Sequence, residues 1–232
     1  MVWIRYVWYF IGVALVTWML TQLEISFPGS LKLHEFANES EQLGTSEFSP
    51  VEIIQSVIIG VCGLLMAWVT KYCPSQRPIA IPFGGMALAF LISELDYFLD
   101  RYLVDNLWQV LIIVSGALVI AYTYRQLRRF RVAWGRIWPS PGLALLFAGA
   151  LILFVFVRLI GLESLWMSIL GDGYHRVVKL AVEEFIELIG YLLWLIGSIE
   201  YTYQARVIAM RDPQPAAKRR RQRRLPDSKG RY

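Results

Sequence analysis

Long apolar stretches recur six times along the chain and are separated by shorter polar segments. They lie near Tyr6–Gln22, Val51–Thr70, Ile79–Leu99, Leu107–Tyr124, Gly142–Ile160 and Val177–Tyr201. A helix needs about 20 mostly apolar residues to cross a hydrocarbon core of about 30 Å. The pattern therefore predicts an all-α polytopic membrane protein, with six transmembrane helices in one domain over residues 1–210.

The composition supports this interpretation. Of the 232 residues, 56% are hydrophobic and only 18% are charged, a balance unusual for a soluble domain of this length. The first stretch is expected to stay in the protein as a membrane anchor, because no small-residue cleavage site follows it.

Basic residues mark one side of the membrane. Lys71 and Arg77 flank the second loop, and six of the seven residues in 218–224 are Lys or Arg. The loop between the fourth and fifth stretches carries Arg125, Arg128, Arg129, Arg131 and Arg136. Because Lys and Arg favour cytoplasmic loops, both termini are predicted to be cytoplasmic in a multi-pass protein of the inner or plasma membrane.

The basic segments also predict partners. Residues 211–232 read as a disordered cytoplasmic tail, which attracts anionic lipid by about 1 kcal/mol per basic residue near the surface. The tail could also dock a protein partner. A specific nucleic-acid partner is not expected beside so many apolar stretches. Basic and bulky apolar residues alternate over 125–138, which predicts a helix lying on the inner leaflet.

Six acidic residues interrupt the apolar stretches near the outer side of the predicted bundle. They are Glu94, Asp96, Asp100, Glu183, Glu184 and Glu187. A charge at the centre of a membrane helix costs roughly 2.5–3.5 kcal/mol on the insertion scale, so such residues indicate a functional site. Glu187 is predicted to be the deepest, roughly 15 Å from the start of its helix.

Helical phase divides these acids. At 100° per residue, Glu183 and Glu187 share a face, whereas Glu184 is turned toward another neighbour. Glu94 points away from the face that carries Asp96 and Asp100, and whether these two acids or Glu184 join the site stays open. The predicted polar cluster comprises Glu94, Arg101, Arg158, His175, Arg176, Lys179, Glu183 and Glu187.

Acids outnumber cations in this region. Surplus carboxylates in a low dielectric either hold protons or share a bound cation. The leading hypothesis is therefore that the cluster binds or moves a proton, a small cation or a small polar solute. The alternative is a non-enzymatic structural or assembly protein held by an ion-pair network.

A metal-dependent membrane enzyme is the lesser alternative. Glu94, Glu183 and Glu187 could hold a divalent cation through oxygen ligands. A catalytic zinc needs three protein ligands, which here would require His34, His175 and one carboxylate. No nucleophile or nucleotide-binding motif is present in the sequence, so an enzymatic role is not favoured. Substrate and oligomeric state are left open.

Overall fold

The computed structural model describes residues 2–28 and 50–211, and in these ranges the regular structure is entirely helical. The predicted all-α class is confirmed for this part of the chain. The basic tail and His34 lie outside it. The elements are α1 (Val2–Ser26), α2 (Pro50–Tyr72), α3 (Arg77–Glu94), α4 (Asp96–Tyr102), α5 (Leu107–Arg125), α6 (Leu127–Ile137), α7 (Pro141–Leu151), η1 (Ile152–Phe156), α8 (Val157–Ile160), α9 (Glu163–Leu170), η2 (Gly171–Gly173) and α10 (Arg176–Arg211).

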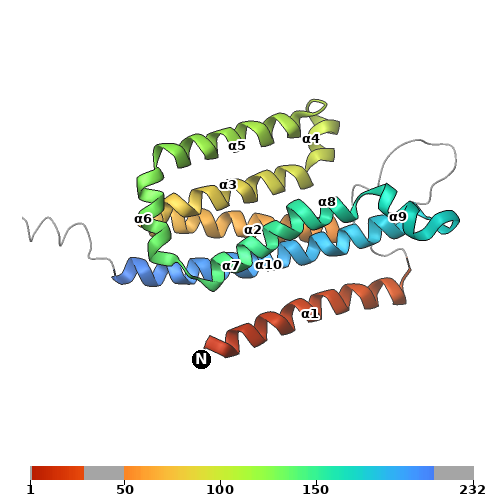
Figure 1. Ribbon diagram of the computed structural model, residues 1–232, viewed down its shortest axis with the longest axis horizontal. Coiled ribbons are helices and arrows are strands. Elements are labelled where there is room, and N and C mark those ends of the chain that lie inside the picture. Colours follow the sequence, from red (N-terminus) through yellow and green to blue (C-terminus); the bar gives the residue numbers. More distant parts are fainter. Residues whose placement is uncertain (1, 29–49, 212–232) are drawn as a thin grey trace, which may run out of the picture.

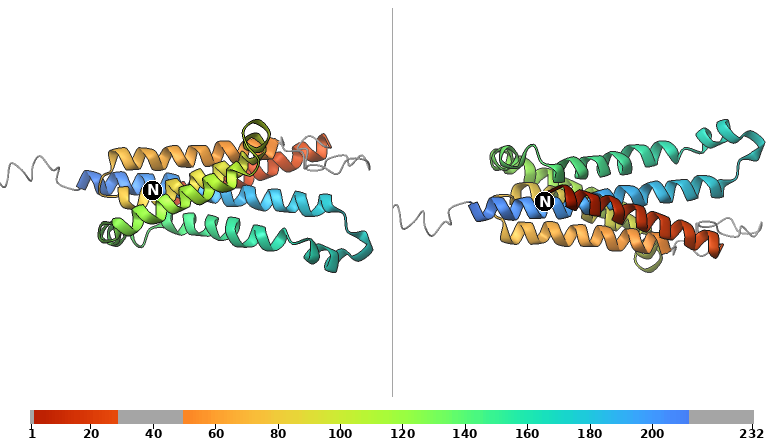
Figure 2. Two further views of the ribbon diagram at one scale, coloured as in Figure 1. Left: turned by 90° about the horizontal axis from the view of Figure 1, so that it is seen from above. Right: turned by 90° about the horizontal axis from the view of Figure 1, so that it is seen from below.

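The long helices lie side by side along one axis (Figure 1). They are α1, α2, α3, α5, the continuous rod α7–η1–α8, and α10, and Figure 2 shows the same alignment from above and below. Helix α6 lies across one end of the bundle, and α4 and α9 lie at the opposite end (Figure 1). The two ends therefore carry different short helices, and we call them the α6 end and the α9 end.

Four helices in the described ranges are long and apolar enough to cross a membrane: Ile4–Ser26, Pro50–Tyr72, Leu107–Arg125 and Pro141–Ile160. These four helices indicate that the chain is a membrane protein. Helices α3 and α10 do not join this group. Helix α3 has 18 residues, with a charge at each end. Helix α10 has 36 residues, but four glutamates, at positions 183, 184, 187 and 200, interrupt its apolar part.

Each predicted apolar stretch falls on a helix, but two boundaries differ. The third stretch was predicted to continue to Leu99, whereas α3 ends at Glu94 and a new short helix starts at Asp96. At the break, the Leu95 N–H bonds weakly to two carbonyls, those of Leu91 and Ile92. The sixth stretch was predicted to end at Tyr201, but α10 continues to Arg211. Its last turns are more polar, but their backbone still forms helical hydrogen bonds.

Helix α10 is the centre of the bundle and packs against α7 on one side and α2 on the other. Glycines bring α7 and α10 into backbone contact. A Cβ on Gly142 would lie 2.6 Å from the Tyr201 nitrogen, and one on Gly149 would lie 2.9 Å from the Gly190 oxygen. Small residues allow such close packing between membrane helices. These contacts fix α10 against the rod α7–η1–α8.

The rod contains one widened turn, the π-helical segment η1, where the sequence predicted a uniform helix. Leu153 of η1 is buried and lies against Gly190, where a Cβ would come 2.8 Å from its side chain. Such π turns are frequent at functional sites. This one faces α10 at the residue just before Tyr191.

Helices α1 and α5 form the outer surfaces of the bundle. No residue of α5 is buried, and α1 exposes large apolar side chains such as Trp8, Phe10 and Trp18. Continuous apolar surfaces of this size mark contact with a partner or a membrane. Such surfaces suit helices that are long and apolar enough to cross a membrane.

Candidate functional site

Three carboxylates on the first part of α10 face three different neighbours. Glu183, Glu184 and Glu187 are all half-buried. Because the helix turns 100° per residue, Glu184 is offset from the other two. Glu183 lies toward α8, Glu184 toward α2, and Glu187 within electrostatic range of both α3 and α8. Helix α10 thus places acidic groups toward α2, α3 and α8.

Glu94 and Tyr191 join α3 to α10. The Tyr191 hydroxyl donates a hydrogen bond to the Glu94 carboxylate, with the two oxygens 2.5 Å apart. Tyr191 is buried, and its ring meets Phe90 edge-on at 5.9 Å between centroids. Tyr191 follows Glu187 by one helical turn, so both side chains lie on the same face of α10. The hydrogen bond therefore brings Glu94 to the face of α10 that carries Glu187.

Gln55 joins α2 to α10 in a similar way. Its amide nitrogen donates to the main-chain oxygen and to the carboxylate of Glu184, both at 3.2 Å. Gln55 is fully buried, and its side-chain oxygen has no hydrogen-bond donor among the described residues. A buried acceptor without a donor costs about 1–3 kcal/mol. The Gln55 oxygen therefore offers an unmet acceptor beside the Glu184 carboxylate.

Glu187 lies among charges from three other segments. The groups close enough to act on its carboxylate are Glu94, Glu183 and Glu52, all acidic, and the cation Arg158. Acidic neighbours thus outnumber the cation around Glu187. Burial in a low dielectric makes an excess of like charge costly.

The same neighbours recur around the other acids. Glu184 is within electrostatic range of Glu52 and Glu187, and Glu94 is within range of Glu52 and Glu184. We refer to Glu52, Glu94, Glu184 and Glu187 as the carboxylate cluster. Its members come from α2, α3 and α10, so it exists only in the folded bundle.

Glu183 stands at the edge of this cluster. It pairs with Lys179 one turn earlier on α10, at 3.6 Å, and both side chains are about one-fifth exposed (18% and 19%). It also packs on α8, where a Cβ on Gly161 would lie 2.6 Å from a Glu183 oxygen. Glu183 thus has its own cation and a close fit to α8.

The remaining predicted cations lie farther out. Arg158, His175 and Arg176 are all exposed, and Arg158 lies within electrostatic range of Glu187. The side chain of Arg101 lies outside the described part of the structure. The fold thus brings Glu94, Glu187, Glu183, Lys179 and Arg158 together, while His175 and Arg176 occupy the exposed start of α10.

Asp96 and Asp100 belong to α4, beyond the break that ends α3. In Figure 1, α4 turns away from the axis of α3 toward the start of α5. Asp96 is nevertheless within electrostatic range of Glu94. One oxygen of Asp100 is buried without a hydrogen-bond partner among the described residues. The break in α3 separates these two acids from the helix that carries Glu94.

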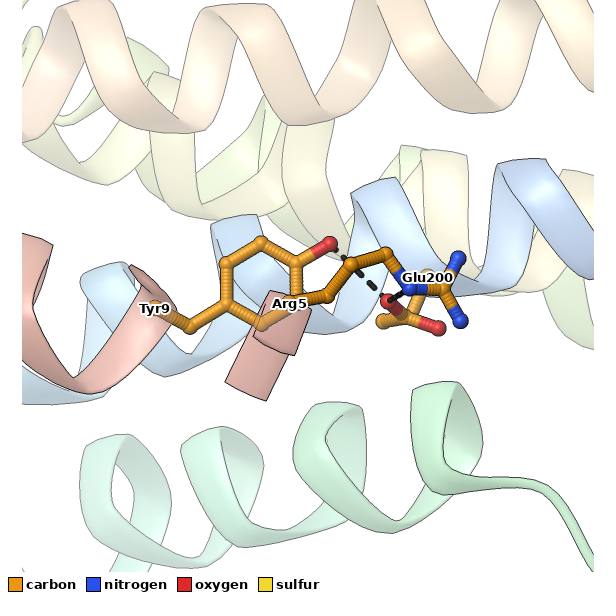
Figure 3. Close-up of polar contacts among 3 residues, drawn as sticks. All are labelled: Arg5, Tyr9 and Glu200. Atoms are coloured by element: carbon orange, nitrogen blue, oxygen red, sulfur yellow. Dashed lines mark hydrogen bonds and ion pairs between the residues drawn. The ribbon is translucent and has the colours of Figure 1, made fainter. Parts of the chain in front are cut away.

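A second polar group, which sequence reasoning missed, attaches α1 to α10 (Figure 3). Glu200 is fully buried, and one of its oxygens accepts a hydrogen bond from the Tyr9 hydroxyl at 2.9 Å. The same oxygen lies 3.5 Å from the Arg5 Nε, and the Arg5 guanidinium stacks over the ring of Tyr203 at 4.5 Å. Since α1 otherwise touches α10 sparsely, this ion pair is its main polar anchor.

Metal ligands do not converge in the described ranges: no group of three or more His, Cys, Asp or Glu side chains is placed to hold a metal ion. His175 is exposed at the start of α10. His34, the other histidine considered for zinc, lies outside the described residues. The divalent-cation hypothesis thus gains no preformed ligand set from this part of the chain.

Four residues that complete these sites were left out of the predicted polar cluster: Glu52, Gln55, Tyr191 and Glu200. Glu52 lies in the first turn of α2, where a capping role explains an acid without any further function. Tyr191 and Gln55 carried a signal. Tyr191 follows Glu187 at helical spacing, and Gln55 is a polar residue inside an apolar stretch. Glu200 could not be recognised, because it stands next to the predicted end of the sixth stretch, where a charge is ordinary.

Comparison with known proteins yields no relative: the chain matches no described protein family, no curated protein and no solved structure. The functional argument therefore rests on the geometry of the carboxylate cluster.

Proposed function

We propose that this is a polytopic membrane protein that binds protons at the carboxylate cluster of Glu52, Glu94, Glu184 and Glu187, and moves or exchanges them with one side of the membrane. The observation that carries the proposal is that four acidic groups from three helices lie within electrostatic range of one another. Buried negative charges within range of one another need a balancing positive charge. A proton is the smallest cation that could fit into a packed bundle.

Hydrogen bonding in the cluster supports proton binding. The buried oxygen of Gln55 has no donor in the part of the chain that the structure describes, while the Gln55 amide holds the Glu184 carboxylate beside it. A protonated carboxylic acid is a hydrogen-bond donor, whereas an ionised one only accepts. A proton on Glu184 would therefore supply the donor that Gln55 lacks. Tyr191 offers Glu94 a hydroxyl through which a proton can be passed.

The proposed topology has six membrane spans with both termini on the cytoplasmic side. Charge at the two bundle ends supports it. The α6 end collects the basic residues of α6, together with Lys71, Arg77 and Arg211. The α9 end collects acids, including Glu94, Asp96 and Glu163. Because basic loops favour the cytoplasm, the cluster faces the external side in this topology.

The test is proton titration of the purified protein by infrared difference spectroscopy, since a protonated carboxylic acid has a carbonyl band that the carboxylate lacks. Stepping the pH of the wild-type protein from about 9 to about 6, above the range in which exposed carboxylates titrate, is expected to produce this band. Glu187→Gln and Glu184→Gln are each expected to remove part of it. The matched control is Glu163→Gln, which removes an exposed acid at the same end of the bundle and should leave the band unchanged.

Movement of protons is tested separately in liposomes that contain a trapped pH-sensitive dye. A potassium diffusion potential is expected to drive acidification that depends on Glu187 but not on Glu163. If titration shows no protonated carbonyl band in the wild type, proton binding is refuted. If the band disappears on adding sodium, potassium or magnesium at constant pH, the cluster is a small-cation site instead.

A structural role is the second candidate function. The fully buried Glu200, paired with Arg5 and Tyr9, favours it, because this contact serves to hold α1 on the bundle. A purely structural protein would show neither a protonated carbonyl band above about pH 6 nor proton flux. It would also tolerate Glu187→Gln without any loss beyond a change in stability.

A further inference from the structure

A basic hollow lies at the α6 end of the bundle, far from the carboxylate cluster. It has a volume of about 390 Å³, and it is open to the surface. One wall is the connection between α2 and α3, and the other is α6. The lining residues are Pro74, Ser75, Pro78, Arg128, Arg129, Val132 and Arg136. Three arginines thus border a single depression.

Helix α6 is built to present these arginines. Arg128, Val132 and Arg136 recur at every fourth position, so they share one face of the helix, and Arg129 flanks that face. Buried Ala133 and Ile137 lie about 120° round the helix from this face and pack against the bundle. The basic face is therefore held in place by packing.

The chemistry of the hollow suits a phosphate. Arginine guanidinium groups bind phosphate oxygens through paired, charge-assisted hydrogen bonds. Across from them, the Ser75 hydroxyl is buried and has no hydrogen-bond partner among the described residues. It can donate to a phosphate oxygen that the arginines hold once the Ser75 side chain turns toward the hollow that the residue lines. Among the described residues, no acidic side chain lines the hollow.

The surroundings indicate that the phosphate belongs to a lipid. Val132, which lines the hollow, is 53% exposed, and Trp138 at the end of α6 is 56% exposed. The adjoining α5 has no buried residue and is apolar throughout its length. An acyl chain can follow this surface while the headgroup enters the hollow. Basic pockets at the cytoplasmic ends of membrane helices bind anionic headgroups in this way.

We infer that the hollow between α6 and the α2–α3 connection is a binding site for the headgroup phosphate of an anionic phospholipid, with Arg128, Arg129 and Ser75 as its principal ligands. The site does not depend on the proposed proton chemistry. It would anchor α6, and with it the connection between α5 and α7, to the cytoplasmic leaflet.

The test is a titration of the full-length protein, in neutral detergent, with dioctanoyl phosphatidylglycerol, followed by tryptophan fluorescence or native mass spectrometry. Dioctanoyl phosphatidylcholine and glycerol phosphate serve as the other two probes. Phosphatidylglycerol is expected to bind saturably. Phosphatidylcholine should bind at least about tenfold more weakly, because its choline cation meets the arginines. Glycerol phosphate should also bind more weakly, because it lacks the acyl chains.

The pocket variant is Arg128→Gln with Arg129→Gln, and its matched control is Arg125→Gln with Arg131→Gln. All four side chains are exposed, but only the first two line the hollow. The pocket variant is expected to lose at least about tenfold more affinity for phosphatidylglycerol than the control. Ser75→Ala should weaken binding by about threefold to tenfold.

Three outcomes would overturn the inference. Equal losses in the pocket and control variants would mean that the basic surface attracts lipid without a site. Glycerol phosphate binding as tightly as the lipid would assign the hollow to a soluble phosphate. Saturable binding that none of the variants alters would place the lipid elsewhere on the protein. Circular dichroism and thermal unfolding of each variant confirm that the fold is intact.

Discussion

Replacing Gly142 with alanine tests the backbone contact that positions α10. The new Cβ would lie 2.6 Å from the nitrogen and 3.0 Å from the Cα of Tyr201, whereas ordinary contacts start at 3.4 Å. The shortfall, 3.4 − 2.6 = 0.8 Å, cannot be met by turning a side chain, because the nearest atoms all belong to the backbone. One helix must move, and overpacking of this kind costs about 1–3 kcal/mol.

The matched control is Gly116→Ala in α5, where no atom lies within 4 Å of the new Cβ. Alanine favours a helix over glycine by up to about 1 kcal/mol at either position, so the difference between the two variants isolates the clash. The free energy of unfolding is measured by titrating SDS into the protein in mild detergent and following tryptophan fluorescence. Gly142→Ala is expected to be about 2 kcal/mol less stable than Gly116→Ala. Equal stability of the two variants would refute direct backbone contact between α7 and α10.

Three further predictions use the same preparation. Arg5→Met should destabilise the protein by about 2 kcal/mol, because it leaves the buried Glu200 carboxylate unpaired, although the one-third exposure of Arg5 limits the loss. Adding Glu200→Gln should restore most of that stability, and failure to do so would contradict an ion pair. Neutralising Lys179 and Glu183 together should change the free energy of unfolding by less than about 0.5 kcal/mol, as for other ion pairs one helical turn apart. A larger loss would show that the pair is structural. Burial raises the pKa of the Cys73 thiol, so little of the reactive thiolate is present near pH 8. Alkylation of Cys73 should therefore be slow until the protein is unfolded. Fast labelling of the folded protein would rule out burial.

The limits of sequence reasoning are clearest at α3 and α10. Periodicity located both helices, but it did not locate the break at Leu95 or the ten residues of α10 beyond Tyr201. The pattern of apolar residues reflects how favourably side chains transfer into lipid. It does not show where the backbone changes direction, or where a polar helix continues into water. The topology with six spans is likewise still a prediction. In the described part of the chain, four helices are long and apolar enough to cross a membrane.

The sequence by itself determined the helical class, the membrane-length stretches and the unusual position of Glu94, Glu184 and Glu187 within them, because these follow from hydropathy and from a period of 3.6 residues. Phase along α10 also separated Glu184 from Glu183 and Glu187. Only the tertiary structure decided which groups meet. Gln55, Tyr191 and Glu200 acquired partners 129, 97 and 191 residues away, on helices whose relative rotation no local pattern encodes. The tertiary structure also decided how α7 packs on α10, because their backbones can approach closely only where glycines leave side chains absent.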